Sequence, residues 1–186
     1  AILTNALQHV HTTGWTDESI ANGTLDAGLP PSYIGQATTS TSSFGSGDLV
    51  AFFMNECNAN LKQQLVQDVV AEEKRGDNSL QGDNNTNNNV EQIATRINKA
   101  IHIRLSMILP YIKNNKWVEG MAIGALPQNA VKTADQLDEL AIIVLDYALK
   151  GIAEKNRVGS SSKHNAAKRA AVVAVYAATE LHLLAD

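Results

Sequence analysis

Apolar residues recur at steps of three and four positions between Val90 and Asn115. This spacing is the period of a helix that buries one stripe of side chains. Further apolar residues lie off the stripe in the later turns, and Pro110 is expected to kink or stop the helix there. The pattern predicts a central helix whose C-terminal half is surrounded by other helices. The stripe consists of Val90, Ile93, Ile97, Ile101, Leu105, Ile108 and Ile112.

Similar patterns predict helices along the rest of the chain, so the expected fold class is all-α. The first short helices, with Thr16 as an N-cap and Gly28 as a stop signal, resemble a helix-turn-helix whose third helix begins at Pro30 or Pro31. We therefore expect a helix-turn-helix-like subdomain at residues 1–47 and a helical bundle of the ligand-binding type at 48–186. Helices are predicted at 2–11, from Thr16 to Gly28, and at 48–75, 90–115, 117–126, 134–155 and 164–184, with loops at 38–47 and 76–89 and a linker at 158–162.

The charge distribution argues against binding to nucleic acid. Lys62 is the first basic side chain, and the formal net charge of the chain is -4. A specific DNA-binding protein neutralises about 6 to 10 phosphates with Lys and Arg side chains. A helix-turn-helix without basic residues cannot do so, and no nucleic-acid partner is expected.

The sequence carries no recognisable catalytic or metal-binding motif. The five histidines are scattered, and no Glu-x-x-His or His-Glu-x-x-His pair is present. The single Cys57 lies on an apolar helical stripe, which indicates a buried thiol. No stretch is long and apolar enough to cross a bilayer. We therefore expect a non-enzyme without a metal or cofactor.

Three helices that must pack together carry an excess of apolar side chains. Such a surface forms either plain core or the lining of a ligand cavity, and pockets between helices are a usual site for apolar ligands. The pattern alone does not separate the two. The residues are Leu105, Leu109, Met121, Leu126, Leu140, Val144, Leu145 and Tyr147.

Several short motifs occur in one order along the chain, from about His9 to Asp186. They are Gly14-Trp15-Thr16, Ile20-Ala21, Gly28-Leu29, Leu49-Val50, Phe52-Phe53, Cys57-Asn58, Arg104-Leu105, Ile108-Leu109-Pro110-Tyr111-Ile112, Leu126-Pro127 with Asn129, Asp146-Tyr147-Ala148, Lys168-Arg169-Ala170 through Tyr176, and Thr179-Glu180-Leu181. Together these motifs resemble the coenzyme Q biosynthesis lipid-binding family known as Coq nine.

The resemblance implies a TetR-like helical bundle whose helix-turn-helix no longer binds DNA and whose larger domain encloses an apolar ligand. Family members are peripheral proteins on the matrix side of the mitochondrial inner membrane. They bind isoprenoid quinone intermediates and present them to the di-iron demethoxyubiquinone hydroxylase. The resemblance thus implies lipid binding by Leu105, Leu109, Met121, Leu140, Val144, Leu145 and Tyr147, and partner binding by Leu126, Pro127, Gln128 and Asn129.

Some positions depart from the family pattern. Gln128 stands where the family tends to have His, and Leu145 and Asn165 stand where Trp is usual. Large aromatic residues often anchor interfaces, so these changes are expected to weaken the docking surface.

The first hypothesis is therefore a non-catalytic lipid-binding accessory protein of ubiquinone biosynthesis. The alternative is a repurposed structural subunit of a large mitochondrial membrane complex, either a respiratory complex or ATP synthase, that no longer delivers lipid. The departures, the Asn-rich segment and the end of the sequence before the family's amphipathic C-terminal helix motivate this alternative.

Overall fold

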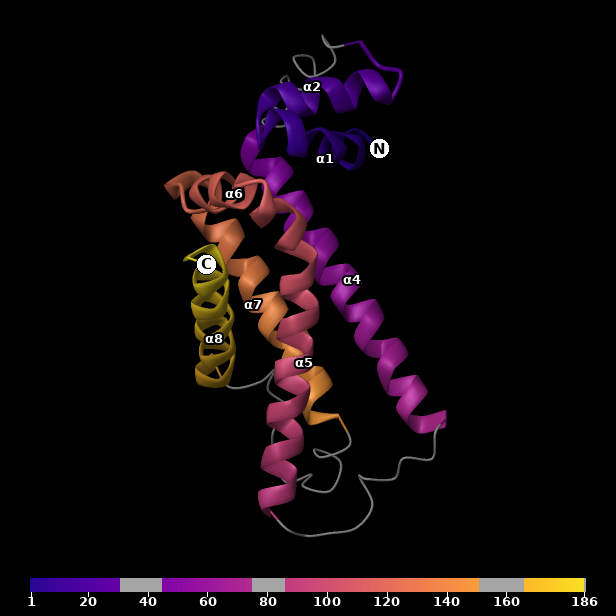
Figure 1. Cartoon of the computed structure of the whole chain (residues 1–186), viewed down its shortest axis with the longest axis vertical. Coiled ribbons are helices and arrows are strands. Elements are labelled where there is room, and N and C mark those ends of the chain that lie inside the picture. The colour runs from indigo at the N-terminus through magenta and orange to yellow at the C-terminus, as the bar shows by residue number, and fades with distance from the viewer. Residues whose placement is uncertain (31–44, 75–85, 151–165, 186) are drawn as a thin grey trace. The chain divides into compact units, whose positions relative to one another are not determined.

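The computed structural model describes residues 1–30, 45–74, 86–150 and 166–185, and all regular structure within them is α-helical (Figure 1). The predicted all-α class is therefore confirmed. The predicted third helix at Pro31 and the linker at 158–162 lie outside the described residues. The helices are α1 (Ile2–Thr13), α2 (Asp17–Asp26), α4 (Ser46–Lys74), α5 (Thr86–Lys113), α6 (Lys116–Gly124), α7 (Pro127–Leu149) and α8 (Ala166–Ala185).

The signals predicted at both ends of α2 are confirmed. The backbone N–H of Ser19 donates to Oγ1 of Thr16 at 3.4 Å, so Thr16 is the N-cap. At the other end, Gly28 has a φ of 74°, in the left-handed region that glycine adopts without steric cost. Its N–H donates to the carbonyl of Leu25, which closes the helix. Helices α1 and α2 pack against each other.

The chain divides into two compact units. Unit 1 contains Ala1–Glu56 and Ile108–Gln136, and unit 2 contains Cys57–Met107 and Leu137–Asp186. Helices α4, α5 and α7 each contribute residues to both units. The division at residue 47 that the sequence suggests stays a prediction.

Aromatic side chains form the core of unit 1. Trp15, which follows α1, is almost fully buried, and its ring lies 5.3 Å from Phe53, 5.4 Å from Tyr111 and 5.8 Å from Trp117 between centroids. Its indole Nε1 donates to the carbonyl of Lys116 at 2.7 Å. Gly120 lies against this ring, and a Cβ there would stand 3.0 Å from Nε1. The core thus joins segments far apart in the sequence.

The core of unit 2 is built from apolar stripes on α4, α5, α7 and α8. The stripe on α5 is buried from Ile101 to Leu105, whereas Val90 at its start is exposed. The thiol of Cys57 is buried, as predicted. The remaining stripes contribute Leu61, Leu65, Leu140, Val144, Val172 and Tyr176.

Helix α5 differs from the prediction at both ends. It begins at Thr86, within the segment predicted as a loop. It continues through Pro110 to Lys113, so of the two effects expected of Pro110, a kink or a stop, the stop does not occur. Once the packed turns have formed, adding a polar turn to a helix costs little. The chain uses that freedom to extend α5 beyond its apolar stripe.

Helix α7 begins at Pro127 instead of Ala134, so Thr133 is not its N-cap. Proline is favoured in the first turn of a helix because its missing N–H would have no partner there. The helix also ends earlier than predicted, at Leu149 instead of Lys155.

Helix α8 carries apolar residues on nearly every side from Ala170 onward. Only one face is buried, through Val172, Tyr176 and Glu180, while Val175 and Leu181 are exposed. Most apolar residues of α8 are alanines, which bury little area and give no strong drive toward enclosure. None of the helices in the described ranges has both the length and the hydropathy for a membrane crossing.

Candidate functional site

The corner between α6 and α7, in unit 1, is held by two side chains of α7. The amide Nδ2 of Asn129 donates to the carbonyl of Ile123 at 2.8 Å, and Oγ1 of Thr133 donates to the carbonyl of Gly124 at 2.9 Å. The last carbonyls of a helix have no partner within the helix. The first turns of α7 therefore satisfy the end of α6 and fix the corner.

The predicted partner residues lie at this corner. Leu126, Pro127 and Gln128 are exposed, and the exposed fraction of Leu126 is 42%. Asn129 is half-buried, and its amide is committed to the hydrogen bond with Ile123. Three of the four residues are thus available to a partner, and the fourth positions them.

Contacts between the first turns of α4 and α7 also hold the corner in place. A Cβ on Gly47 would stand 2.5 Å from Oδ1 of Asn129, so a larger residue there would displace the Asn129 amide. Lys132 pairs with Asp48 at 2.8 Å, and Gln136 donates to the carbonyl of Ala51 at 2.7 Å. Because Gln136 is buried, this bond ties α7 to α4 away from water.

The sequence reasoning missed two exposed valines on the same two helices. Val131 follows Pro127 by one helical turn and is 73% exposed, and Val118 on α6 is also exposed. Pro127 and Val131 lie one turn apart on α7, and neighbouring exposed apolar side chains are typical of interaction sites. A helical-wheel comparison of α7 from its true start at Pro127 would have placed Val131 beside Pro127.

The residues predicted to line a lipid cavity are divided between the two units. Leu109, which is partly exposed, and Met121, which is half-buried, belong to unit 1. The other five are all buried and belong to unit 2, where the structure brings them into one apolar core. They are Leu105, Leu140, Val144, Leu145 and Tyr147.

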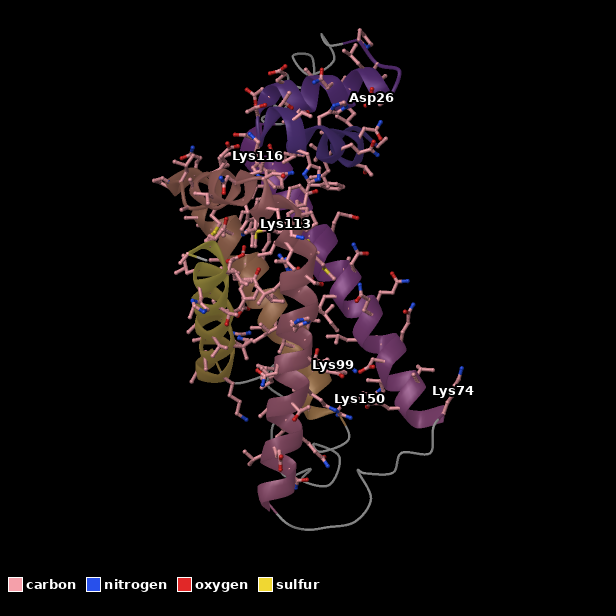
Figure 2. All side chains as sticks on the ribbon, in the orientation of Figure 1. Asp26, Lys74, Lys99, Lys113, Lys116 and Lys150 are labelled. Atoms are coloured by element: carbon pink, nitrogen blue, oxygen red, sulfur yellow. The ribbon has the colours of Figure 1, made fainter. Side chains whose placement is uncertain are left out.

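Tyr147 takes part in a polar network that the apolar pattern did not reveal. Its hydroxyl donates to Asp68 at 2.5 Å, and Asp68 also pairs with Lys99, which projects from α5 (Figure 2). The guanidinium of Arg96 lies 5.6 Å from the centroid of the Tyr147 ring. Burial raises the pKa of Tyr147, and the hydrogen bond to Asp68 raises it further. Only the ring of Tyr147 can therefore contribute to an apolar site.

A second polar cluster lies buried in unit 2, between α4, α5 and α8. Arg104 of α5 is 0% exposed, and its guanidinium carbon lies 5.6 Å from the centroid of the Tyr176 ring on α8. The Tyr176 hydroxyl donates to Oε1 of Glu180 at 3.0 Å, one helical turn further along. Burial raises the pKa of Tyr176; Arg104 acts to lower it, and Glu180 and Cys57 add to the rise.

The donor atoms of Arg104 distinguish this cluster. Nε, Nη1 and Nη2 are all buried, and among the described residues none of them has a hydrogen-bond partner. The sequence signal was a charged residue beside Leu105 in an otherwise apolar stretch of α5. Apart from its place in the Arg104-Leu105 motif, Arg104 is not assigned a role by the sequence pattern. Chemically, the cluster offers hydrogen-bond donors in an apolar setting, and the described residues hold no group of three or more metal-ligating side chains.

Comparison with known proteins identifies relatives over the whole chain. The family model for the N-terminal domain of ubiquinone biosynthesis protein COQ9 matches residues 1–24. The mitochondrial ubiquinone biosynthesis protein COQ9 of Rattus norvegicus is 30% identical over 193 residues, which cover 100% of this chain and 51% of the relative. The human protein of the same name is 28% identical, with 100% of this chain and 50% of the relative covered.

A similar protein is found in a third organism. The probable ubiquinone biosynthesis protein coq9 of Dictyostelium discoideum, also named as mitochondrial, is 27% identical over 100% of this chain and 52% of its own length. The chain thus spans about half the length of the curated relatives it matches. The family resemblance seen in the sequence motifs is confirmed, because the whole chain is similar to the COQ9 ubiquinone biosynthesis proteins.

Proposed function

We propose that this protein acts in mitochondrial ubiquinone biosynthesis as a non-catalytic accessory protein. It binds an isoprenoid quinone intermediate and presents it to the demethoxyubiquinone hydroxylase on the matrix side of the inner membrane. The similarity of the whole chain to proteins named for ubiquinone biosynthesis carries this proposal.

The buried apolar residues of unit 2 support the lipid-binding part. Leu105 of α5 and Leu140 and Val144 of α7 are all buried in this unit, which also contains the buried polar cluster of Arg104. An apolar lining with few convergent polar groups is the usual composition of a site for a small hydrophobic molecule.

The α6–α7 corner supports the partner-binding part. Its exposed residues are mostly apolar, and two side-chain hydrogen bonds and the contacts with α4 hold it in place. A surface that is already ordered loses little conformational entropy when a partner binds.

Recovery of bound lipid tests the first part. The protein would be purified from mitochondria of its own host, and an organic extract of it would be analysed by mass spectrometry. We expect an isoprenoid quinone or a precursor of one. Co-migration of the protein with a respiratory or ATP-synthase complex, with no isoprenoid in the extract, would contradict the proposal.

A pull-down of the hydroxylase tests the partner surface. Leu126→Glu places a charge on the corner, and retention of the hydroxylase is expected to fall about tenfold or more, as for loss of a central interface residue. Leu25→Glu, on α2 of the same unit with 53% of the residue exposed, is the matched control and should retain the hydroxylase. Equal retention by both variants would exclude the corner as the docking surface.

A further inference from the structure

Two arginines on α5 have opposite surroundings, although each lies 5.6 Å from the centroid of a tyrosine ring. Arg96 donates to Glu72 at 2.9 Å and to the carbonyl of Lys150 at 2.8 Å. Arg104, two turns later, is fully buried and its three guanidinium nitrogens have no acceptor among the described residues. The first arginine is a structural link, whereas the second has donors left for another molecule.

Such a buried guanidinium is costly for the protein alone. A buried donor without an acceptor costs about 1 to 3 kcal/mol, and more when the group is charged. Arginine also presents its donors in a rigid planar fork, which suits two acceptor oxygens at once. A ligand that supplies those acceptors would recover this free energy on binding.

The charge balance of the cluster indicates what kind of head group fits. The guanidinium of Arg104 lies over the ring of Tyr176, and the carboxylate of Glu180 accepts from the Tyr176 hydroxyl. A cation and a carboxylate therefore contact the same buried tyrosine. The negative charge of Glu180 offsets the positive charge of Arg104 on the other side of the Tyr176 ring. Among the described residues, Glu180 does not accept a hydrogen bond from the Arg104 guanidinium. A ligand therefore needs to bring acceptor oxygens and no negative charge, because an added anion would also face Glu180.

We propose that Arg104 determines specificity for the polar head of the ligand: its guanidinium donates hydrogen bonds to the carbonyl-type oxygens of a neutral quinone-like head group. This inference rests on the proposed lipid-binding function and deepens it by naming the residue that distinguishes a quinone from a plain isoprenoid. Tyr176 and Glu180 are positioning residues that hold the guanidinium and balance its charge.

A binding comparison with two probes tests the inference. The probes are a short-chain ubiquinone and an oxygen-free isoprenoid hydrocarbon of matched length, measured against the full chain. Wild-type protein should bind the quinone more tightly than the hydrocarbon. Arg104→Met, which keeps the apolar bulk, should weaken quinone binding about tenfold or more and leave hydrocarbon binding unchanged.

The controls separate recognition from folding. Arg169→Met removes an arginine of α8 that pairs with Asp138 at 3.0 Å, and it should keep the preference for quinone. Arg104→Lys keeps the charge but loses the planar fork, so it should also lose most of the preference, and it serves if the methionine variant does not fold. Because Arg104→Met leaves the buried carboxylate of Glu180 without the neighbouring cation, its unfolding temperature without ligand is measured as well, and binding is compared at a temperature where the variant is folded.

The outcomes are distinct. Quinone binding by Arg104→Met that equals wild type would overturn the role of Arg104 and leave the proposed function standing. Loss of both probes together would show a structural role and overturn the inference as well. Stronger binding of an anionic benzoate head than of the quinone would contradict the charge argument. Failure of the wild-type protein to bind either probe would instead contradict the proposed function itself.

Discussion

At the scale of single residues, Trp15 organises unit 1. It joins the segment after α1 to α4 through Phe53 and to the start of α6 through the hydrogen bond with Lys116. The two residues of that bond are 101 positions apart in the sequence. Large aromatic side chains supply much of the stabilisation of a core, and a buried indole needs its N–H paired.

Trp15→Phe is expected to destabilise the protein by about 1 to 3 kcal/mol, because the carbonyl of Lys116 loses its donor and the ring volume shrinks. Chemical denaturation would measure the free energy of unfolding. Val118→Ala, at an exposed position of the same unit, should change it by no more than about 0.5 kcal/mol. A change that small for Trp15→Phe would mean that this cluster is not the core of unit 1.

Tyr176 gives a prediction about alkaline pH. Its pKa in the folded protein is raised above the ordinary value of 10.0, mainly by burial, so the folded state keeps a proton that the unfolded state releases. The contribution to stability is complete below pH 10 and is lost as the pH rises above that value. Stability should therefore fall above pH 10, and less steeply in Tyr176→Phe than in wild type. Parallel curves of unfolding free energy against pH for the two proteins would refute this.

At the scale of elements, the helix boundaries show what the sequence can and cannot predict. Periodic apolar positions predicted most helices in the described ranges, because burial of a stripe is a local property of the sequence. The end signals Thr16 and Gly28 predicted α2. A proline can end one helix or open the next, and Pro127 opens α7 before the predicted start at 134. The choice between the two roles depends on whether neighbouring side chains satisfy the carbonyls of α6, which is a tertiary property.

The same distinction applies to the candidate sites. The burial of Leu105, Leu140 and Val144 follows from periodicity and was predicted. The buried cluster at Arg104 was not predicted, because a sequence does not show whether a charged residue on a buried helix face forms an ion pair with a carboxylate. Here the acid, Glu180, contacts the hydroxyl of Tyr176 instead of accepting from the guanidinium in any described hydrogen bond.

Thr133→Val tests the α6–α7 corner as an element. Loss of the hydrogen bond to the carbonyl of Gly124 should cost about 1 kcal/mol and increase hydrogen exchange of the amides at 123–130. Thr12→Val is the control, since the exposed Thr12 donates to a carbonyl of its own helix. Equal exchange at the corner in both variants would show that Thr133 does not hold it.

At the scale of the whole molecule, the two proposed binding roles fall on different units. Unit 2 buries the apolar residues proposed to bind lipid together with the cluster at Arg104, and unit 1 exposes the apolar corner proposed to bind the hydroxylase. The formal net charge is -4, and no Lys or Arg precedes Lys62. A polyanionic partner is therefore not expected for either role. The protein is therefore proposed to bind one hydrophobic ligand and one protein partner.

Native mass spectrometry of the intact protein, released from mitochondria of its host without organic solvent, tests this central claim most directly. We expect a population heavier than the bare chain by the mass of one isoprenoid quinone or precursor, and we expect that adduct to diminish in Arg104→Met. A folded wild-type protein that carries no such adduct while its host accumulates these intermediates would contradict the account.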